Sequence, residues 1–280
     1  MNEIANHAKT EFEKQWRLEN LETEIANCPQ YDIYPTFEKY IARNMRILES
    51  GCGLGRWVFH YHRRGYDITG LDWSQQTVDL IKSFDHDVRV VCGDARKTDF
   101  KNGEFDLVLS LGTVEHSIEG PAMALADTNR ILKKNGILIV TVPLLTPFRR
   151  SLFLLKRVVQ VSRSLCYSIR RKPFVGIWHV SKVAQRGPHV TAIRDNDGYH
   201  FFQYEFPSGL FERYLQAAGF QIIESFPTFK PDGLYNDLGA LVGQWDFSNG
   251  RPHFNPVGRL LLRLLPNCFY HMFVCVARKA

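Results

Sequence analysis

Residues 46–56 read Arg-Ile-Leu-Glu-Ser-Gly-Cys-Gly-Leu-Gly-Arg, and this stretch decides the fold. Ile47 and Leu48 form an apolar run of strand length, three glycines follow at alternate positions, and residues 56–64 read as a helix that Gly65 stops. Strand, glycine turn and helix are the opening of a βαβ unit. Because glycine has no Cβ atom, the turn can bring its backbone against a ligand, and the unpaired N–H groups of the helix favour a negative group there.

The spacing of the glycines separates two classes of ligand. A dinucleotide fingerprint requires G-x-G-x-x-G, and counting from Gly51 its third glycine would fall on Arg56. An NAD-dependent oxidoreductase is therefore disfavoured. The sequence has Glu49-x-Gly51-x-Gly53-x-Gly55 instead. Taken alone, such a loop also suits a tight turn in another kind of α/β protein.

Length and composition bound the architecture. The 280 residues suffice for one α/β domain with additions, or at most two domains, and a hydrophobic content of 45% is ordinary for a globular protein. The six cysteines form no C-x-x-C pair, so disulfide and zinc frameworks are disfavoured, no metal site is predicted, and a reducing cytoplasm is the default. We find no signal peptide in residues 1–24 and no run of about 18 apolar residues, so a cytoplasmic protein is expected.

Two further acids follow the next two predicted strands. Residues 67–71 predict a strand that ends in Asp72, where an acid can accept hydrogen bonds from both hydroxyls of a ribose. Trp73 could pack on an adenine ring. Residues 88–92 predict the third strand, which Gly93-Asp94-Ala95 follows. The alternative for both acids is a surface turn.

The fourth landmark is a predicted strand at 105–110, followed by Leu111-Gly112-Thr113-Val114-Glu115-His116. A helix over 121–134, stopped by Gly136, and a fifth strand over 137–142 come next. In this order, the landmarks of residues 45–143 resemble class I methyltransferases that use S-adenosylmethionine (SAM). The resemblance is to the broad group that includes quinone-biosynthesis and other small-molecule enzymes.

The resemblance implies a fold and a cofactor site. The fold is a Rossmann-like, seven-stranded, doubly wound α/β sheet with an antiparallel last strand. In this family Asp94 would accept a hydrogen bond from the adenine amino group, the backbone N–H of Ala95 would meet a ring nitrogen, and Leu111 would lie against the cofactor. The predicted SAM-binding residues are Glu49, Gly51, Gly53, Gly55, Asp72, Trp73, Asp94, Ala95 and Leu111.

The catalytic residues are less constrained than the cofactor site. The resemblance places Glu115 and His116 at the mouth of the site, His116 as a candidate general base and Glu115 as an orienting group. His200 and Tyr204 are further candidates. Each of these side chains could instead be structural. An Asn-Pro-Pro-Tyr sequence, usual where the substrate is an adenine base, is missing at this landmark, which argues against such a substrate.

We expect one domain in four parts. Residues 1–45 would form N-terminal helices over 3–26 and 35–44, and residues 46–143 the SAM-binding core. Residues 144–200 would form a basic amphipathic insertion. Residues 201–280 would complete the core with a helix over 208–218, a sixth strand over 220–226 and a last strand over 269–277.

The insertion is unusual in its charge. From Thr128 to Arg194 there are 14 Lys and Arg and no Asp or Glu. Residues 147–171 predict a helix on which four bases recur every seven residues, opposite an apolar face; the bases are Arg149, Lys156, Arg163 and Arg170. Two interpretations stand: the helix binds an anionic membrane surface, or it covers the substrate pocket. A nucleic-acid partner is disfavoured, because no recognition motif accompanies the charge.

Residues 257–265 are either a second surface anchor or a helix packed before the last strand.

The predicted function is SAM-dependent methyl transfer to a small-molecule, lipid or glycan acceptor, at a membrane surface if the first interpretation holds. Holding donor and acceptor in line can supply much of the acceleration. The alternative is a non-catalytic SAM-fold accessory or binding protein. Intact glycines and both acids argue against a decayed cofactor site but do not establish an acceptor site.

Overall fold

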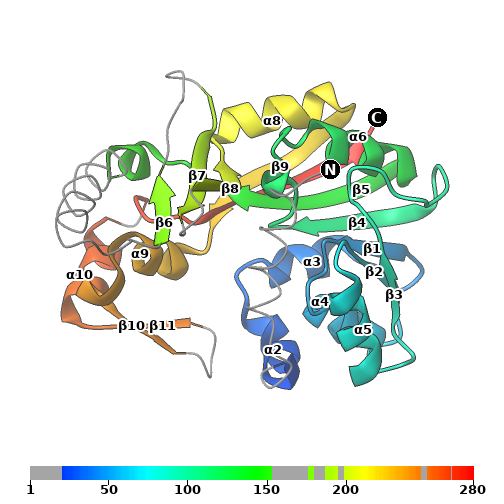
Figure 1. Ribbon diagram of the computed structural model, residues 1–280, viewed down its shortest axis with the longest axis horizontal. Helices are drawn as coiled ribbons and strands as arrows, with labels where there is room; N and C mark the ends of the chain where they lie inside the picture. Colours follow the sequence, from blue (N-terminus) through cyan, green and yellow to red (C-terminus); the bar gives the residue numbers. More distant parts are fainter. Residues whose placement is uncertain (1–20, 153–175, 180–186, 195–198, 247–250, 266) are drawn as a thin grey trace.

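The computed structural model describes residues 21–152, 176–179, 187–194, 199–246, 251–265 and 267–280. Its centre is a seven-stranded sheet in the order β3-β2-β1-β4-β5-β12-β9 (Figure 1). The parallel strands are β1 (Arg46–Ser50), β2 (Asp67–Asp72), β3 (Arg89–Cys92), β4 (Phe105–Leu111) and β5 (Leu132–Pro143). The last strand, β12 (Met272–Lys279), runs antiparallel to β5 and to β9 (Phe220–Thr228). The expected Rossmann-like doubly wound α/β sheet with an antiparallel last strand is confirmed.

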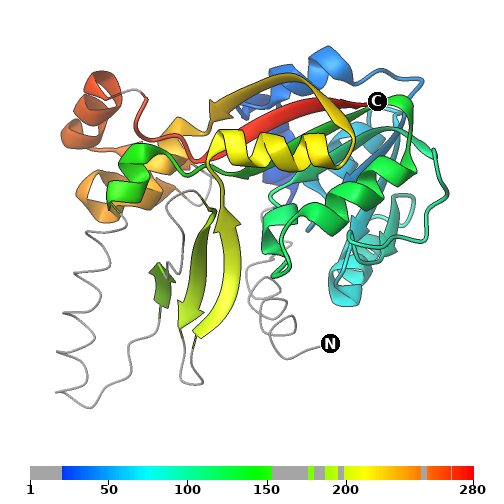
Figure 2. The same cartoon turned by 90° about the horizontal axis from the view of Figure 1, so that it is seen from above.

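Helices cover both faces of this sheet (Figures 1 and 2). On one face lie α3 (Tyr34–Tyr40), α4 (Arg56–His62) and α5 (Gln75–Phe84), and on the other lie α6 (Ala122–Ile131) and α8 (Ser208–Ala217). Successive residues of a strand point to opposite faces. Accordingly, Leu107 and Leu109 join the apolar cluster under the first layer, and Val108 joins the cluster under the second. Strands buried on both faces read as the continuous apolar runs seen in the sequence.

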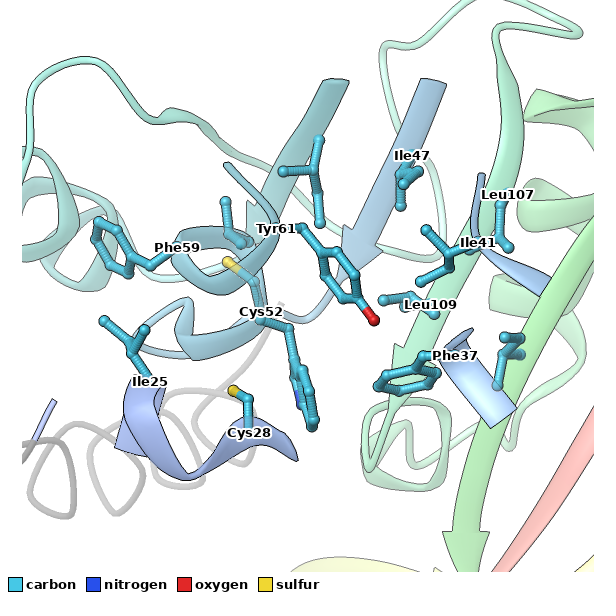
Figure 3. Close-up of a cluster of buried hydrophobic side chains, with 14 of the residues drawn as sticks. Ile25, Cys28, Phe37, Ile41, Ile47, Cys52, Phe59, Tyr61, Leu107 and Leu109 are labelled. Atoms are coloured by element: carbon cyan, nitrogen blue, oxygen red, sulfur yellow. The ribbon is translucent and has the colours of Figure 1, made fainter. Parts of the chain in front are cut away.

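The N-terminal helices pack beside the glycine turn. Ile25 of α2 (Leu21–Asn27), Cys28 of the short helix η2 (Cys28–Gln30) and Phe37 of α3 enter the same buried cluster as Ile47 and Leu107 of the sheet (Figure 3). The helix expected over 35–44 is shorter, because the chain is already extended at Ile41. The helix expected over 3–26 falls for the most part outside the described residues.

The predicted boundary between the helix over 121–134 and the strand over 137–142 is wrong. The helix expected to reach Lys134 ends at Ile131, and β5 begins at Leu132 instead of residue 137. Leu132 has extended backbone angles (φ −71°, ψ 141°), is fully buried, and pairs with Phe105. The burial of Leu132 in the sheet outweighs the helix propensity of the two lysines that follow it.

The insertion contains a small sheet. Strands β6 (Gly176–His179), β7 (His189–Arg194) and β8 (Tyr199–Glu205) form an antiparallel three-stranded sheet apart from the main one (Figure 2). The segment expected to be a helical insertion over 144–200 is therefore partly β structure, and β8 crosses its expected end. A helix does begin at residue 147, and the Oγ1 atom of Thr146 caps it by accepting from the N–H of Arg149 at 3.0 Å. The rest of the predicted basic helix, from residue 153, lies outside the described residues.

A second added layer precedes β12. It consists of α9 (Lys230–Leu238), η4 (Gly239–Leu241), the hairpin of β10 (Gly243–Asp246) and β11 (Arg251–Phe254), and α10 (Pro256–Leu264). Leu234, Val242 and Phe269 form its own apolar cluster. The layer lies beyond the carboxyl ends of the parallel strands (Figure 1).

Arg149 is not on an exposed basic face, as its heptad position predicted, but in a buried ion cluster. Its side chain is 5% exposed. Its Nε atom donates to Oδ1 of Asp237 on α9 at 3.0 Å, and its Nη1 atom lies 4.0 Å from Oε2 of Glu205 on β8. Its Nη2 atom lies 3.1 Å from Nδ1 of His271, whose pKa is lowered to about 3 by burial and then by Arg149. The neutral imidazole can therefore accept from the guanidinium. The cluster fastens both added parts of the chain to the end of the main sheet.

Arg149→Ala should lower the free energy of unfolding by about 3–5 kcal/mol, because it leaves two buried carboxylates without their cation. Urea unfolding followed by circular dichroism measures this change. The matched control is Arg150→Ala, since Arg150 is exposed one residue further on; it should cost about 1 kcal/mol or less. Equal small effects of the two substitutions would show that the cluster does not fasten the added parts.

Candidate active site

A cavity of about 410 Å³ opens at the carboxyl ends of β1, β2 and β4. This volume is within the range of small-molecule sites. All nine residues that the sequence predicted for the cofactor line it: Glu49, Gly51, Gly53, Gly55, Asp72, Trp73, Asp94, Ala95 and Leu111. They come from four separate strand ends, as expected for a ligand at the carboxyl edge of a parallel sheet. Their role in binding remains a prediction.

The glycine turn is packed so closely that Gly51 tolerates no side chain. Its φ of 76° is in the left-handed region, and a Cβ atom added there would lie 2.3 Å from Oγ1 of Thr113. Its N–H group donates to the carbonyl of Leu71 at 2.8 Å, and Thr113 donates to the carbonyl of Ser50 at 3.1 Å. The turn thus ties the ends of β1, β2 and β4 together.

Asp72 is held in place by the turn. Its Oδ2 atom accepts from the N–H of Gly53 and its Oδ1 atom from the N–H of Ser74, each at 3.0 Å. Ser74 in turn caps α5 by accepting from the N–H of Thr77 at 3.2 Å. A carboxylate has about four acceptor positions. These bonds therefore orient the buried carboxylate without excluding donors from a ligand.

Glu49 is an acid buried in the cavity wall. It is 3% exposed, and its Oε2 atom has no hydrogen-bond partner among the described residues. Burial raises its pKa to about 8, although the nearby Arg56 and the backbone N–H of Val58 act in the opposite direction. A buried acid with an unsatisfied oxygen fits a ligand that brings a positive donor.

Arg96 was not predicted and shapes the site beside Asp94. Its Nη2 atom donates to Oδ2 of Asp94 at 2.7 Å, and its Nη1 atom to Oε2 of Glu119 at 3.0 Å. Burial would raise the pKa of Asp94, but its hydrogen bonds with Arg96 keep it below the ordinary value. Asp94 therefore stays ionised, with a guanidinium next to it in the cavity wall. The sequence feature that could have identified Arg96 is its position, two residues after Asp94.

His116 also lines the cavity, on the short helix η3 (Val114–His116). Its Nδ1 atom is 2.8 Å from the carbonyl oxygen of Phe202 on β8. Because a carbonyl only accepts, Nδ1 carries the proton and Nε2 the lone pair. Burial lowers the pKa of His116 to about 4, so the ring is neutral near pH 7.

Glu115, expected at the mouth of the site, is instead buried behind the cavity wall. Its side chain is 2% exposed and does not line the cavity, and its Oε1 atom is 3.9 Å from Nε2 of His116. Burial raises its pKa to about 8.

The other two candidates also lie outside the cavity lining. The hydroxyl of Tyr204 donates to the carbonyl of Ile118 at 2.8 Å, which holds the loop after η3 against β8. His200 is not in the lining either, but its neighbour Phe201 is. Strand alternation alone could not have selected Phe201, because its position depends on how the β7–β8 hairpin docks on η3. Glu24 of α2 also lines the cavity and was not predicted.

Comparisons with known proteins agree with the geometry. Residues 48–140, about a third of the chain, match the family model described as a methyltransferase domain. An uncharacterised protein of Methanocaldococcus jannaschii is 34% identical over 100 residues, covering 36% of this chain and 41% of that protein. A ubiquinone biosynthesis O-methyltransferase of Alkalilimnicola ehrlichii is 30% identical over 122 residues. The match covers 40% of this chain and 49% of that protein. The chain thus spans about two-fifths to one-half of the length of these curated relatives.

Solved structures share the whole fold. A Pyrococcus horikoshii protein superposes with a TM-score of 0.56 at 15% identity, covering 89% of this chain and 88% of that one. A second structure is the 1,6-didemethyltoxoflavin N1-methyltransferase of Burkholderia thailandensis with S-adenosylhomocysteine bound. It superposes with a TM-score of 0.51 at 15% identity, covering 94% of this chain and 79% of that one. The core that carries the glycine turn and the three acids thus matches a methyltransferase domain, and structures with the same fold include SAM-dependent methyltransferases.

No group of three or more His, Cys, Asp or Glu side chains among the described residues is placed to hold a metal ion. Likewise, no helix in the described part of the chain combines the length and the apolar character needed to cross a membrane.

Glu49 should make the free energy of unfolding of the ligand-free protein depend on pH. Its folded pKa of about 8 lies above the ordinary 4.5, so the stability it contributes is complete below pH 4.5 and is lost as the pH rises through 8. Between about pH 5.5 and 7, which lies between the unfolded and the folded pKa, Glu49→Gln should remove a decline of about 1.4 kcal/mol per pH unit in the free energy of unfolding. Urea unfolding at a series of pH values measures both slopes. Parallel slopes for wild type and variant would contradict the raised pKa.

Proposed function

We propose that this chain transfers a methyl group from SAM to a small-molecule acceptor bound against His116. The observation that carries the proposal is the convergence of the glycine turn and three acids on one cavity, with a neutral histidine in the same wall. The relatives named as ubiquinone and menaquinone methyltransferases, and the neighbour that binds S-adenosylhomocysteine, support it.

The residues present fit the cofactor. The unsatisfied Oε2 atom of Glu49 suits the ammonium group of the amino-acid part. Asp72 would accept from the ribose hydroxyls, and Asp94 from the adenine amino group, with Trp73 and Leu111 as apolar contacts. When bound, SAM supplies a methyl group made electrophilic by its sulfonium.

His116 would hold the proton that the acceptor loses. The Phe202 carbonyl fixes the tautomer in which Nε2 can take a proton. Glu115, 3.9 Å from Nε2, would stabilise the imidazolium when ionised. The cavity lining includes the apolar Val114, Ile118 and Phe201 as well as the polar Thr113, Ser117 and Glu119. The apolar side chains suit a planar or lipid-like acceptor.

A membrane surface contacted through residues 147–171 is supported by the sequence alone. Of its bases, Arg149 is buried in an ion cluster, so any such surface would depend on the exposed Arg150 and on the bases from residue 156 onward. Strand β8 supports the other interpretation, in which the insertion covers the substrate pocket, because Phe201 lines the cavity.

The second candidate is a SAM-binding accessory protein without turnover. The burial of Glu115 favours it, because the raised pKa of about 8 keeps this carboxyl, 3.9 Å from Nε2 of His116, mostly neutral near pH 7. Cofactor binding without methyl transfer to any acceptor would distinguish it from the enzyme.

Isothermal titration with S-adenosylhomocysteine tests the cofactor site. Wild type should bind, and Asp72→Ala should weaken binding by at least about tenfold, because hydrogen bonds to charged groups are lost. Asp79→Ala is the matched control: Asp79 is an exposed acid on α5 and should leave affinity unchanged. If wild type does not bind, the glycine turn has been misinterpreted.

His116→Ala should reduce kcat by about a hundredfold or more, the usual contribution of a general base. A screen of hydroxylated aromatic and quinol-like acceptors with radiolabelled SAM supplies the assay. Affinity for S-adenosylhomocysteine should not change, because the loss concerns proton transfer. Tyr204→Phe removes a hydrogen bond outside the cavity lining and serves as the control. An unchanged kcat in His116→Ala would exclude this base.

A further inference from the structure

Helix α10 packs through part of its apolar side and presents the rest of that side to solvent. Leu261 and Leu262 contact the cluster of Leu234, Val242 and Phe269. At 100° per residue Val257, Leu260 and Leu264 lie next to one another and border Leu261, and they are 55%, 55% and 64% exposed. Leu241 and Leu265, at the two ends of the helix, are exposed as well. Together these five residues form the α10 patch. An exposed group of large apolar side chains on one helix marks an interaction surface.

The charge around the α10 patch is positive. Arg259 and Arg263 are exposed beside the apolar stripe. From Phe247 to Ala280 the sequence has five Lys and Arg and no Asp or Glu. The two acids closest before this segment are engaged: Asp246 lies 3.0 Å from the His253 imidazole, and Asp237 is buried against Arg149. A partner for this surface must therefore be apolar and anionic at once.

The position of α10 relates it to the site. The helix belongs to the layer beyond the carboxyl ends of the parallel strands (Figures 1 and 2). The cavity opens at those same strand ends. A surface that docks α10 thus meets the molecule at the end where ligands enter.

We propose that α10 binds in the plane of an anionic lipid membrane. The leucines and Val257 enter the boundary between headgroups and acyl chains, and the two arginines pair with lipid phosphates. An amphipathic helix with apolar residues on one face and arginines at its edge has the form of an interfacial membrane helix. The long arginine side chains can reach the headgroups while their carbon chains stay in contact with lipid. This surface is independent of the methyl acceptor.

Vesicle flotation of the full chain tests the proposal. Wild type should float with vesicles of equal parts phosphatidylcholine and phosphatidylglycerol, and less with phosphatidylcholine alone. Leu260→Asp/Leu264→Asp should lower the partition coefficient by at least about tenfold. Arg259→Ser/Arg263→Ser should remove most of the dependence on the anionic lipid and on salt. Met123→Asp is the control, because Met123 is equally exposed on α6 and should not affect flotation.

Titration with S-adenosylhomocysteine, done on every variant, separates this proposal from the proposed function. Unchanged affinity in Leu260→Asp/Leu264→Asp shows that the variant is folded and that the two surfaces are distinct. Three outcomes would overturn the proposal. The first is that wild type does not float with anionic vesicles. The second is that Leu260→Asp/Leu264→Asp floats as well as wild type. The third is that light scattering shows a dimer that Leu260→Asp/Leu264→Asp abolishes, because a second copy of the chain would then cover the patch.

Discussion

The site depends on one steric constraint, the absence of a side chain at Gly51. The backbone there lies so close to Thr113 that a Cβ atom would be 2.3 Å from its hydroxyl. This contact lets the turn after β1 sit against the loop after β4 while its N–H group bonds the end of β2. Glu49, Asp72 and His116 come from different parts of the chain and meet in one cavity because these strand ends are tied together.

The cofactor end of the cavity could be predicted because its residues are fixed by local sequence. Asp72 and Asp94 each follow an apolar run of strand length, and parallel strands end at the same edge. Knowing the strand was therefore enough to place the acid. The boundary of α6 could not be predicted in this way. Lys133 and Lys134 favour helix, but the burial of Leu132 beside β4 starts a strand there, and only the assembled sheet supplies that burial.

Arg149 shows the limit of a one-dimensional charge pattern. Its heptad spacing with Lys156 predicted a shared exposed face. The segment itself contains no acid, so nothing local indicated an ion pair. The carboxylates of Glu205 and Asp237 come from later elements and reach Arg149 only in the folded chain. The charges of two buried acids compensate the burial of the guanidinium, which also donates a hydrogen bond to Asp237.

His116 is positioned in the cavity differently from the residues of the glycine turn. His116 takes its orientation from the Phe202 carbonyl, and Phe201 of the same strand lines the wall. That strand, β8, ends at Glu205, within the ion cluster of Arg149. The imidazole is thus positioned through a strand whose far end is held by a buried arginine. The added segments thus orient a side chain of a cavity that residues of the core otherwise line. A shared fold does not fix such contacts, and no short motif encodes them.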